Sequence, residues 1–149
     1  MKSFIVTGGY GFIGSNLVRF LLKKKFRVIN IDNLSYSAQK YNLKDIAEKN
    51  YVFSKTDINE SDKVLRILKK YKPIGIFNLA ADTHVDRSID SSFNFIKNNI
   101  LGVYKLLEVL KKYKKKIRLI HVSTDEVYGD IPGKKRSHEN FPYIPNSPY

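Results

Sequence analysis

The chain has 149 residues, a formal net charge of +13 and no cysteine. A chain of this length is expected to form one domain with a sizeable core. The missing cysteines exclude a disulfide framework and any metal site or nucleophile built on Cys. No apolar run approaches the length of a bilayer span, and the first residues are too few for a signal-peptide core. The sequence therefore predicts a cytoplasmic protein without a membrane partner.

The positive charge is concentrated in lysine-rich clusters at residues 23–25, 69–70, 111–116 and 134–136. Such a balance is typical of nucleic-acid binders. Nearly all of these residues are Lys rather than Arg, however, and the first three clusters fall at expected helix ends, where cations suit the helix dipole. We therefore favour a compositional bias over nucleic-acid binding, and attraction of an anionic nucleotide remains a third possibility.

Strand and helix patterns alternate along the chain. Short apolar runs predict strands over residues 4–7, 27–31, 51–54, 74–79 and 117–123. Helices are expected over 13–24, 42–48, 62–71 (capped by Ser61) and 91–113. The apolar side of the last helix would comprise Phe95, Ile96, Ile100, Val103, Leu106, Leu107 and Leu110. This alternation predicts an α/β fold of the Rossmann type, with a parallel sheet of order 3-2-1-4-5 covered by helices on both faces.

The first expected strand is followed at once by a glycine motif. Gly8, Gly11 and Gly14 form GxxGxxG, and Gly9 with the last two also gives GxGxxG. Glycines at this spacing allow a tight turn, close approach of backbone to a pyrophosphate, and close packing of helix on strand. An ordinary Gly-rich turn is the alternative, but the strand before the motif and the helix after it favour dinucleotide binding.

The next two strands end in acidic residues. Asp32 lies at the end of the second strand, where a carboxylate binds ribose hydroxyls and favours NAD over NADP. Asp57, followed by Ile58, comes after the third strand and could meet the adenine amino group. A turn or cap role is the alternative for either carboxylate.

Polar residues also follow the fourth and fifth strands. The fourth ends in small residues, Leu79-Ala80-Ala81, and residues 82–88 are then dense in polar groups, which are equally compatible with a solvated loop. The fifth ends in Ser123-Thr124-Asp125-Glu126, where a hydroxyl and two carboxylates suggest acid–base chemistry. From composition alone, two surface carboxylates are an equally good interpretation.

The segments TGGYGFIGSN, LAADTHVDRSI, VSTDEVYG and NSPY together resemble the extended short-chain dehydrogenase/reductase family. Within it they are most similar to the dTDP-glucose 4,6-dehydratases, and the resemblance covers nearly the whole chain. It implies oxidation of the sugar at C4, loss of water across C5 and C6, and reduction at C6, with NAD as a prosthetic group and dTDP-glucose as the substrate.

The resemblance implies catalytic roles for Tyr149 and for three residues at the end of the fifth strand. Tyr149 would deprotonate the C4 hydroxyl, and Thr124 would hydrogen-bond that oxygen. Glu126 would remove the C5 proton, and Asp125 would protonate the departing C6 hydroxyl.

The resemblance also implies the binding residues and gives no metal site. The implied NAD-binding residues are Gly8, Gly11, Phe12, Ile13, Gly14, Asp32, Asn33, Asp57, Ile58, Leu79, Ala80, Ala81, Thr83, Asn98 (or its neighbour Asn99) and Tyr149. The implied substrate-binding residues are Thr83, His84, Asp86, Arg87 and Thr124.

The chain reaches only the Tyr of the family's YxxxK motif, and the sugar-nucleotide-binding lobe is not in it. We therefore expect residues 1–149 to be an incomplete NAD-binding domain with little or no activity alone and with exposed apolar surface on its sheet. Family members form homodimers through a helix bundle that would include residues 91–113; whether this chain does so stays open. The alternatives are another nucleotide-sugar epimerase or dehydratase of the family, or a non-catalytic NAD-binding fragment.

Overall fold

The computed structural model describes residues 1–46, 48–133, 136–147 and 149, and it contains a five-stranded parallel sheet of order β3-β2-β1-β4-β5. The predicted fold class and strand order are confirmed. The strands are β1 Ser3–Thr7, β2 Arg27–Asp32, β3 Tyr51–Lys55, β4 Gly75–Asn78 and β5 Arg118–His121. The α-helices are α1 Phe12–Lys23, α2 Ser61–Tyr71, α3 Val85–Asp90, α4 Ser92–Phe95 and α5 Gly102–Tyr113.

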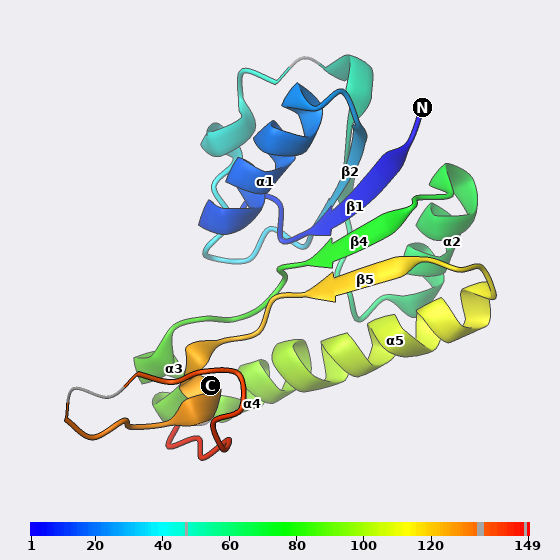
Figure 1. The fold of residues 1–149 in the computed structure, drawn as a ribbon. Coiled ribbons are helices and arrows are strands. Elements are labelled where there is room, and N and C mark those ends of the chain that lie inside the picture. Colours follow the sequence, from blue (N-terminus) through cyan, green and yellow to red (C-terminus); the bar gives the residue numbers. More distant parts are fainter. Residues whose placement is uncertain (47, 134–135, 148) are drawn as a thin grey trace.

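Helices cover the two faces of the sheet (Figure 1). Helix α1 lies on one face, and α2 and α5 pack together on the other. Successive strand residues point to opposite faces. Ile5 accordingly joins the core under α2 and α5, and Val6 joins the core under α1. Because both faces of the central strands are buried, these strands read as continuous apolar runs rather than alternating ones.

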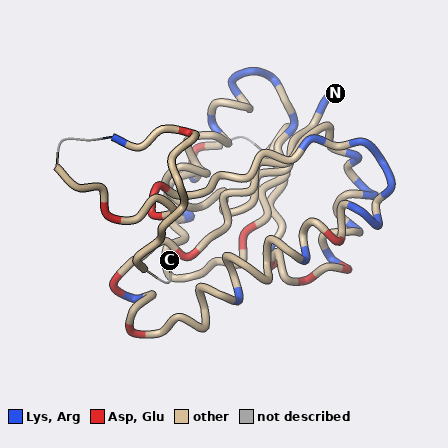
Figure 2. The backbone as a smooth tube through the Cα atoms, turned by 60° about the horizontal axis from the view of Figure 1, so that its bottom comes forward, with Lys and Arg blue, Asp and Glu red and all other residues tan. Residues whose placement is uncertain are grey.

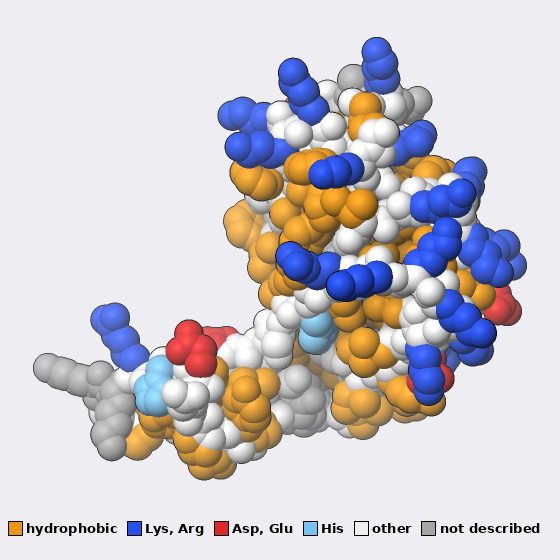
Figure 3. Space-filling view, turned by 45° about the vertical axis from the view of Figure 1, so that its right-hand side comes forward, with side chains coloured by type: hydrophobic (Ala, Val, Ile, Leu, Met, Phe, Trp, Pro, Cys, Tyr) orange, Lys and Arg blue, Asp and Glu red, His pale blue; other side chains and the backbone are white. Residues whose placement is uncertain are grey.

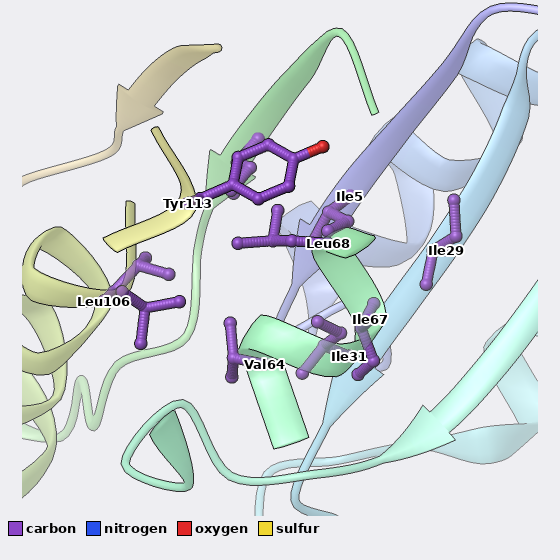
Figure 4. Close-up of a cluster of buried hydrophobic side chains, with 10 residues drawn as sticks. Ile5, Ile29, Ile31, Val64, Ile67, Leu68, Leu106 and Tyr113 are labelled. Carbon is purple, nitrogen blue, oxygen red and sulfur yellow. The ribbon is translucent and has the colours of Figure 1, made fainter. Parts of the chain in front are cut away.

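The larger core lies between the sheet and helices α2 and α5. Figure 4 shows its side chains converging from the strands and from both helices. Its buried members are Ile5, Ile29, Ile31, Val64, Ile67, Leu68, Ile76, Leu106, Val109 and Tyr113. This core holds β1, β2 and β4 side by side, and it thereby fixes the positions of the polar residues at their carboxyl ends.

The short helix predicted over residues 42–48 is wrong. The segment between β2 and β3 instead forms two 3-10 turns, η1 (Lys40–Leu43) and η2 (Glu48–Asn50), and residue 47 lies outside the described residues. Arg19 of α1 donates hydrogen bonds to the backbone carbonyl of Asn42 and to the Asp45 carboxylate. These tertiary contacts hold the connection against α1 in a tighter conformation than an α-helix.

The predicted cap of α2 is also wrong. Ser61 is the first residue of the helix, and Glu60 precedes it without capping it through its side chain. The Glu60 carboxylate accepts the backbone N–H of Asp57 (3.0 Å) instead. The Glu60 side chain is therefore bonded within the preceding turn and does not cap α2.

The long helix predicted over 91–113 is divided into α4, a π-helical segment η3 (Ile96–Leu101) and α5. The predicted apolar side of this helix is only partly correct. Phe95 and Leu106 are buried as predicted, but Ile96, Ile100 and Leu107 are exposed. Val109 and Tyr113 are buried in their place.

Strand β5 is the edge of the sheet in the part of the chain that the structure describes, because it pairs with β4 alone. Ile120 and Val122 at this edge are 44% and 43% exposed. This agrees with the expectation of apolar surface on the sheet. None of the helices within the described ranges is long and apolar enough to cross a membrane.

Candidate active site

Two adjoining cavities lie along the carboxyl edge of the sheet. The narrow cavity, of about 70 Å³, is lined by Gly8, Gly11, Ile31, Asp32, Asn33, Ser35, Ser37, Ala38, Thr56, Asp57, Ile58, residues 79–82 and Asn98. The wide cavity, of about 620 Å³, is lined by Gly8, Gly11, Phe12, Ile13, Gly14, Ser37, residues 79–81, Thr83, Asn99, Ile100, Val103, residues 121–124, Val127 and Tyr149. Since Gly8, Gly11 and residues 79–81 line both, the two cavities form one groove.

All the residues expected to bind NAD line this groove, and most come from separate strand ends. The acids Asp32 and Asp57 are in the narrow cavity, and Phe12, Ile13, Thr83 and Tyr149 are in the wide one. The groove lies where ligands bind in open α/β sheets, outside the carboxyl ends of the strands. Its geometry is compatible with the expected binding roles, which stay predictions.

The glycine loop leaves a specific set of backbone amides free. The first four amides of the loop all have acceptors. The Gly8 amide donates to the Ile31 carbonyl (2.8 Å), and the Gly11 amide donates to the Gly8 carbonyl (3.0 Å). The Gly9 amide donates to Asn30 Oδ1 (3.1 Å), and the Tyr10 amide donates to Asp32 Oδ2 (3.0 Å). Within the described residues, the amides of Phe12, Ile13 and Gly14 have no such acceptor. These three amides form the first turn of α1 and are the ones that can bind an anion there.

Gly14 allows α1 to pack directly on the glycine loop. A Cβ atom at this position would lie 2.1 Å from the Gly8 carbonyl oxygen and 2.8 Å from Gly9 Cα. Both neighbours are backbone atoms and cannot move aside. The third glycine of the motif therefore serves helix–strand packing, as the spacing predicts.

Asp32 is 6% exposed, and both of its carboxylate oxygens are occupied. Oδ2 accepts the Tyr10 amide, and Oδ1 accepts the Leu34 amide (2.8 Å). Asp32 therefore has the turn role that was the alternative to nucleotide binding, and it also lines the narrow cavity. A carboxylate has additional lone pairs with which it can accept bonds from ribose hydroxyls.

Asp57 likewise forms a turn at the edge of the narrow cavity. Its Oδ1 accepts the amide (2.8 Å) and Nδ2 (2.9 Å) of Asn59, and its Oδ2 accepts Asn33 Nδ2 (3.1 Å). Burial raises the pKa of the Asp57 carboxyl, but these hydrogen bonds and the charge of Lys97 together outweigh burial and hold the pKa below its ordinary value.

A buried network that the sequence reasoning missed holds the strip 79–81 against β1. Thr7 Oγ1 accepts the amides of Leu79 and Ala80, both at 3.1 Å, and therefore donates its hydrogen to Asn78 Oδ1 at 2.6 Å. The amide group of Asn78 then faces His121 Nδ1 at 3.0 Å and must donate to it. It follows that His121 carries its ring proton on Nε2.

Two consecutive asparagines from η3 hold the segment after β4. Asn98 Nδ2 donates to the Asp82 carboxylate at 2.6 Å. Asn99 accepts the Asp82 amide and donates to the Asp82 carbonyl, both at 2.9 Å. Adjacent residues of a regular α-helix do not share a face, and here both lie in the π-helical stretch. Of the two residues that the resemblance offered, Asn98 lines the narrow cavity and Asn99 the wide one.

The polar residues after β5 gather at the far end of the wide cavity. Thr124 lines the cavity, and its Oγ1 accepts the Glu126 amide (3.2 Å) at the start of the 3-10 turn η4 (Asp125–Tyr128). Glu126 Oε2 accepts the hydroxyl of Ser147 (3.2 Å), a contact that the sequence reasoning missed. Tyr149 lines the same cavity, with its ring edge-on to Phe95. Asp125 and Glu126 thus lie beside Thr124, although they do not line the cavity themselves.

The structure does not bring all the expected substrate residues to the wide cavity. Thr83 lines it, but residues 85–90 form α3 rather than a loop, and His84, Asp86 and Arg87 do not line it. The Arg87 guanidinium lies over the Tyr36 ring, 4.2 Å from its centroid, and lines a separate cavity with Asp82 and Asp90. Within the described residues, no group of three His, Cys, Asp or Glu side chains could hold a metal ion.

The chain belongs to the family described as GDP-mannose 4,6 dehydratase, whose model matches residues 5–149. Among its relatives is the dTDP-glucose 4,6-dehydratase of Haemophilus influenzae, which is 43% identical over the whole of this chain and 47% of its own length. The dTDP-glucose 4,6-dehydratase 1 of Escherichia coli is 39% identical over 97% of this chain and 45% of its own. The chain thus spans about half the length of the curated relatives it matches.

Solved structures of similar enzymes superpose closely on this chain. The dTDP-glucose 4,6-dehydratase of Bacillus anthracis, in complex with NAD, is 39% identical with a TM-score of 0.89, and the match covers 100% of this chain and 46% of that one. The dTDP-glucose 4,6-dehydratase of Streptomyces venezuelae, also with NAD bound, is 37% identical with a TM-score of 0.91, over 99% and 47%. The UDP-glucose 4-epimerase of Thermus thermophilus, in complex with NAD, is 30% identical with a TM-score of 0.86, over 99% and 46%.

Proposed function

We propose that these 149 residues form the NAD-binding part of a dTDP-glucose 4,6-dehydratase. The observation that carries the proposal is the groove, which is lined by the glycine loop, Asp32 and Thr124. Asp125 and Glu126 lie beside Thr124 at its far end. Solved relatives with the same fold hold NAD. The free amides of Phe12, Ile13 and Gly14 fit a pyrophosphate, and Asp32 fits the hydroxyls of an adenosine ribose.

In this proposal the protein residues divide the proton transfers among themselves. NAD, held by the free amides of residues 12–14 and by Asp32, would supply the hydride acceptor for C4 and the hydride donor for C6. Tyr149 accepts the proton of the C4 hydroxyl, and Thr124 hydrogen-bonds the same oxygen. Glu126 accepts the C5 proton while Asp125 donates a proton to the C6 hydroxyl, which leaves as water. When a hydride then adds at C6, Glu126 returns the proton to C5. Of these four, Thr124 and Tyr149 already line the wide cavity.

Another nucleotide-sugar epimerase or dehydratase of the family is the alternative. An epimerase that only oxidises and reduces C4 needs no acid–base pair for C5 and C6. The adjacent carboxylates Asp125 and Glu126 are a reason to prefer dehydration. The identities point the same way, since dehydratase relatives reach 43%, whereas the UDP-glucose 4-epimerases of Thermus thermophilus and Thermotoga maritima are 30% and 34% identical.

A polypeptide of residues 1–149 alone is expected to bind NAD⁺ but to turn over little or no dTDP-glucose. Its wide cavity offers few groups for the nucleoside and phosphates of the substrate, because His84, Asp86 and Arg87 do not line it. The larger part of the relatives' sequence lies outside the matched region. Turnover by this polypeptide near that of a whole relative would contradict this expectation.

The reaction is tested by joining residues 1–149 to the remaining part of the Haemophilus influenzae relative in place of its own first part. The protein is purified, its NAD content is measured, and it is incubated with dTDP-glucose. Mass spectrometry then distinguishes the reactions, because dehydration gives a product lighter by one water and epimerisation leaves the mass unchanged. We expect the lighter product.

Two variants of the joined protein provide the controls. Glu126→Gln removes the proposed C5 base, and we expect a loss of about 100-fold or more in product formation with NAD content unchanged. Ser137→Ala, a partly exposed position outside both cavities, should have no effect. A folded, NAD-loaded protein that forms no dehydrated sugar would refute the proposed reaction.

A further inference from the structure

The buried asparagine of β2, Asn30, contacts the glycine loop directly. Its side chain is fully buried, and Oδ1 accepts the Gly9 amide at 3.1 Å. Because that amide can only donate, the orientation of the Asn30 amide group is fixed, and Nδ2 donates to the Tyr51 hydroxyl at 2.9 Å. Burial and the neighbouring Tyr10 hydroxyl raise the pKa of Tyr51, so the Tyr51 hydroxyl stays protonated.

Asn30 also explains why residue 9 is glycine. Gly9 does not have the positive φ that Gly8 has, so its backbone conformation admits other residues. A Cβ atom on Gly9 would, however, lie 2.2 Å from Asn30 Oδ1 and 2.4 Å from Asn30 Cγ. The three nearest atoms all belong to Asn30. The absence of a side chain at residue 9 is therefore required by Asn30.

Strand β2 thus binds two successive amides of the loop. Asn30 takes the Gly9 amide and Asp32, two residues further along the same face, takes the Tyr10 amide. These two amides are therefore bonded to side chains of β2. The next unpartnered amides of the described loop, those of Phe12 and Ile13, belong to residues that line the wide cavity.

We propose that Asn30 is a positioning residue for the cofactor: by binding the Gly9 amide to β2, it sets the loop conformation in which the Phe12 and Ile13 amides face the pyrophosphate. This inference rests on the proposed NAD binding and adds to it a residue that does not itself line the groove. Asn30 acts on the loop through its hydrogen bond to the Gly9 amide, and the Tyr51 hydroxyl accepts the hydrogen bond that Asn30 Nδ2 donates.

The first test compares Asn30→Leu with Tyr51→Phe in residues 1–149. Leu has a similar size but cannot accept the Gly9 amide, so we expect the NAD⁺ dissociation constant to rise about tenfold, the effect of losing one buried hydrogen bond. Tyr51→Phe removes the hydroxyl that accepts Asn30 Nδ2 and leaves the bond between Asn30 and the Gly9 amide in place, so it should change the dissociation constant by less than about threefold. Amide hydrogen exchange at Gly9 should become fast in Asn30→Leu and stay slow in Tyr51→Phe.

The second test is a cycle that a merely structural role would not satisfy. Gly9→Ala alone should weaken NAD⁺ binding by about tenfold or more, because its Cβ displaces Asn30. Gly9→Ala combined with Asn30→Ala should bind about as well as Asn30→Ala alone, since the clash has been removed. This arm also decides the matter if Asn30→Leu does not fold.

Additive effects in the cycle, or NAD⁺ binding by folded Asn30→Leu within about twofold of the parent with Gly9 still protected, would overturn the role of Asn30. Failure of the parent chain to bind NAD⁺ at all would instead refute the proposed function. The two failures are therefore distinguishable.

Discussion

Close contacts at single glycines determine whether the loop and α1 can meet. A Cβ on Gly14 would meet backbone at 2.1 Å, whereas a Cβ on Gly11 would lie 3.2 Å from the Gly8 carbonyl oxygen, its only neighbour within 4 Å. Gly11 also has a negative φ of −70°, which other residues adopt. The two glycines therefore differ in how strictly their identity is required, although the motif alone treats them alike.

This difference gives a matched pair of substitutions. Gly14→Ala forces α1 away from the loop and should lower the free energy of unfolding by about 1–3 kcal/mol, the usual cost of overpacking. Gly11→Ala should cost less than about 1 kcal/mol, because one contact relaxes by a few tenths of an ångström. Urea unfolding measures both. Equal effects would contradict the assignment of Gly14 to helix packing.

Motif residues could be predicted from the sequence, but the residues that support them could not. The spacing of Gly8, Gly11 and Gly14 carries its own structural meaning. Asn30 and Asn78 act through partners 21 and 71 residues away, and no local pattern identifies such partners. The one available signal was that each is an amide within an otherwise apolar buried strand, where an unpaired polar group would be costly.

At the scale of elements, the turn after β3 connects stability to pH. The folded-state pKa of Asp57 is below its ordinary value of 3.8, so the unfolded chain binds the proton more readily than the folded chain does. The contribution of Asp57 to stability is therefore present above pH 3.8 and is lost as the pH falls through the folded-state value.

Asp57→Asn tests this connection. The variant should be less stable than the parent at neutral pH, and its free energy of unfolding should fall less steeply between about pH 5 and about pH 3. Denaturant unfolding at several pH values makes the comparison, and Asp62→Asn, on α2 and outside both cavities, is the control. A parent and an Asp57→Asn variant with the same pH slope would contradict the assignment.

The observed element boundaries differ most from the predicted ones where tertiary contacts override the local sequence pattern. Strands and the long helices α1 and α2 were predicted within one or two residues, because their apolar periodicity is strong. The sequence did not predict the π-helical segment η3. In that segment Asn98 and Asn99 both form hydrogen bonds to Asp82, and such tertiary contacts leave no local pattern. Within α5 the buried residues Leu106, Val109 and Tyr113 recur at helical spacing on one side, and Leu107 lies on another, exposed side.

On the scale of the whole molecule, positive charge and the groove lie at opposite edges of the sheet. The last turns of α1, α2 and α5 carry Lys23, Lys69, Lys70, Lys111 and Lys112. Figure 2 shows Lys and Arg gathered near the end that carries the N-terminus, and Figure 3 shows them crowding the surface there. The clusters at 23–25, 69–70 and 111–116 thus lie at helix ends, as predicted, and residues 134–135 lie outside the described residues.

This separation bears on whether the lysines attract the nucleotide. A strand of five residues is about 16 Å long, whereas the Debye length at physiological ionic strength is about 8 Å. Replacing Lys23, Lys24 and Lys25 together by Gln should therefore change the NAD⁺ dissociation constant by less than about twofold at that ionic strength. A rise of about fivefold or more, measured by calorimetry, would show that the basic edge attracts the ligand.

The central claim is that the groove binds NAD through the glycine loop and Asp32, and calorimetric titration of residues 1–149 with NAD⁺ tests it most directly. Asp32→Ala is measured alongside, with Asp45→Ala as the control, since Asp45 is an exposed carboxylate paired with Arg19 outside the groove. We predict saturable binding by the parent and by Asp45→Ala, and binding weakened about tenfold or more by Asp32→Ala. A folded parent chain that takes up no NAD⁺, or one whose affinity is indifferent to Asp32→Ala, would contradict the account.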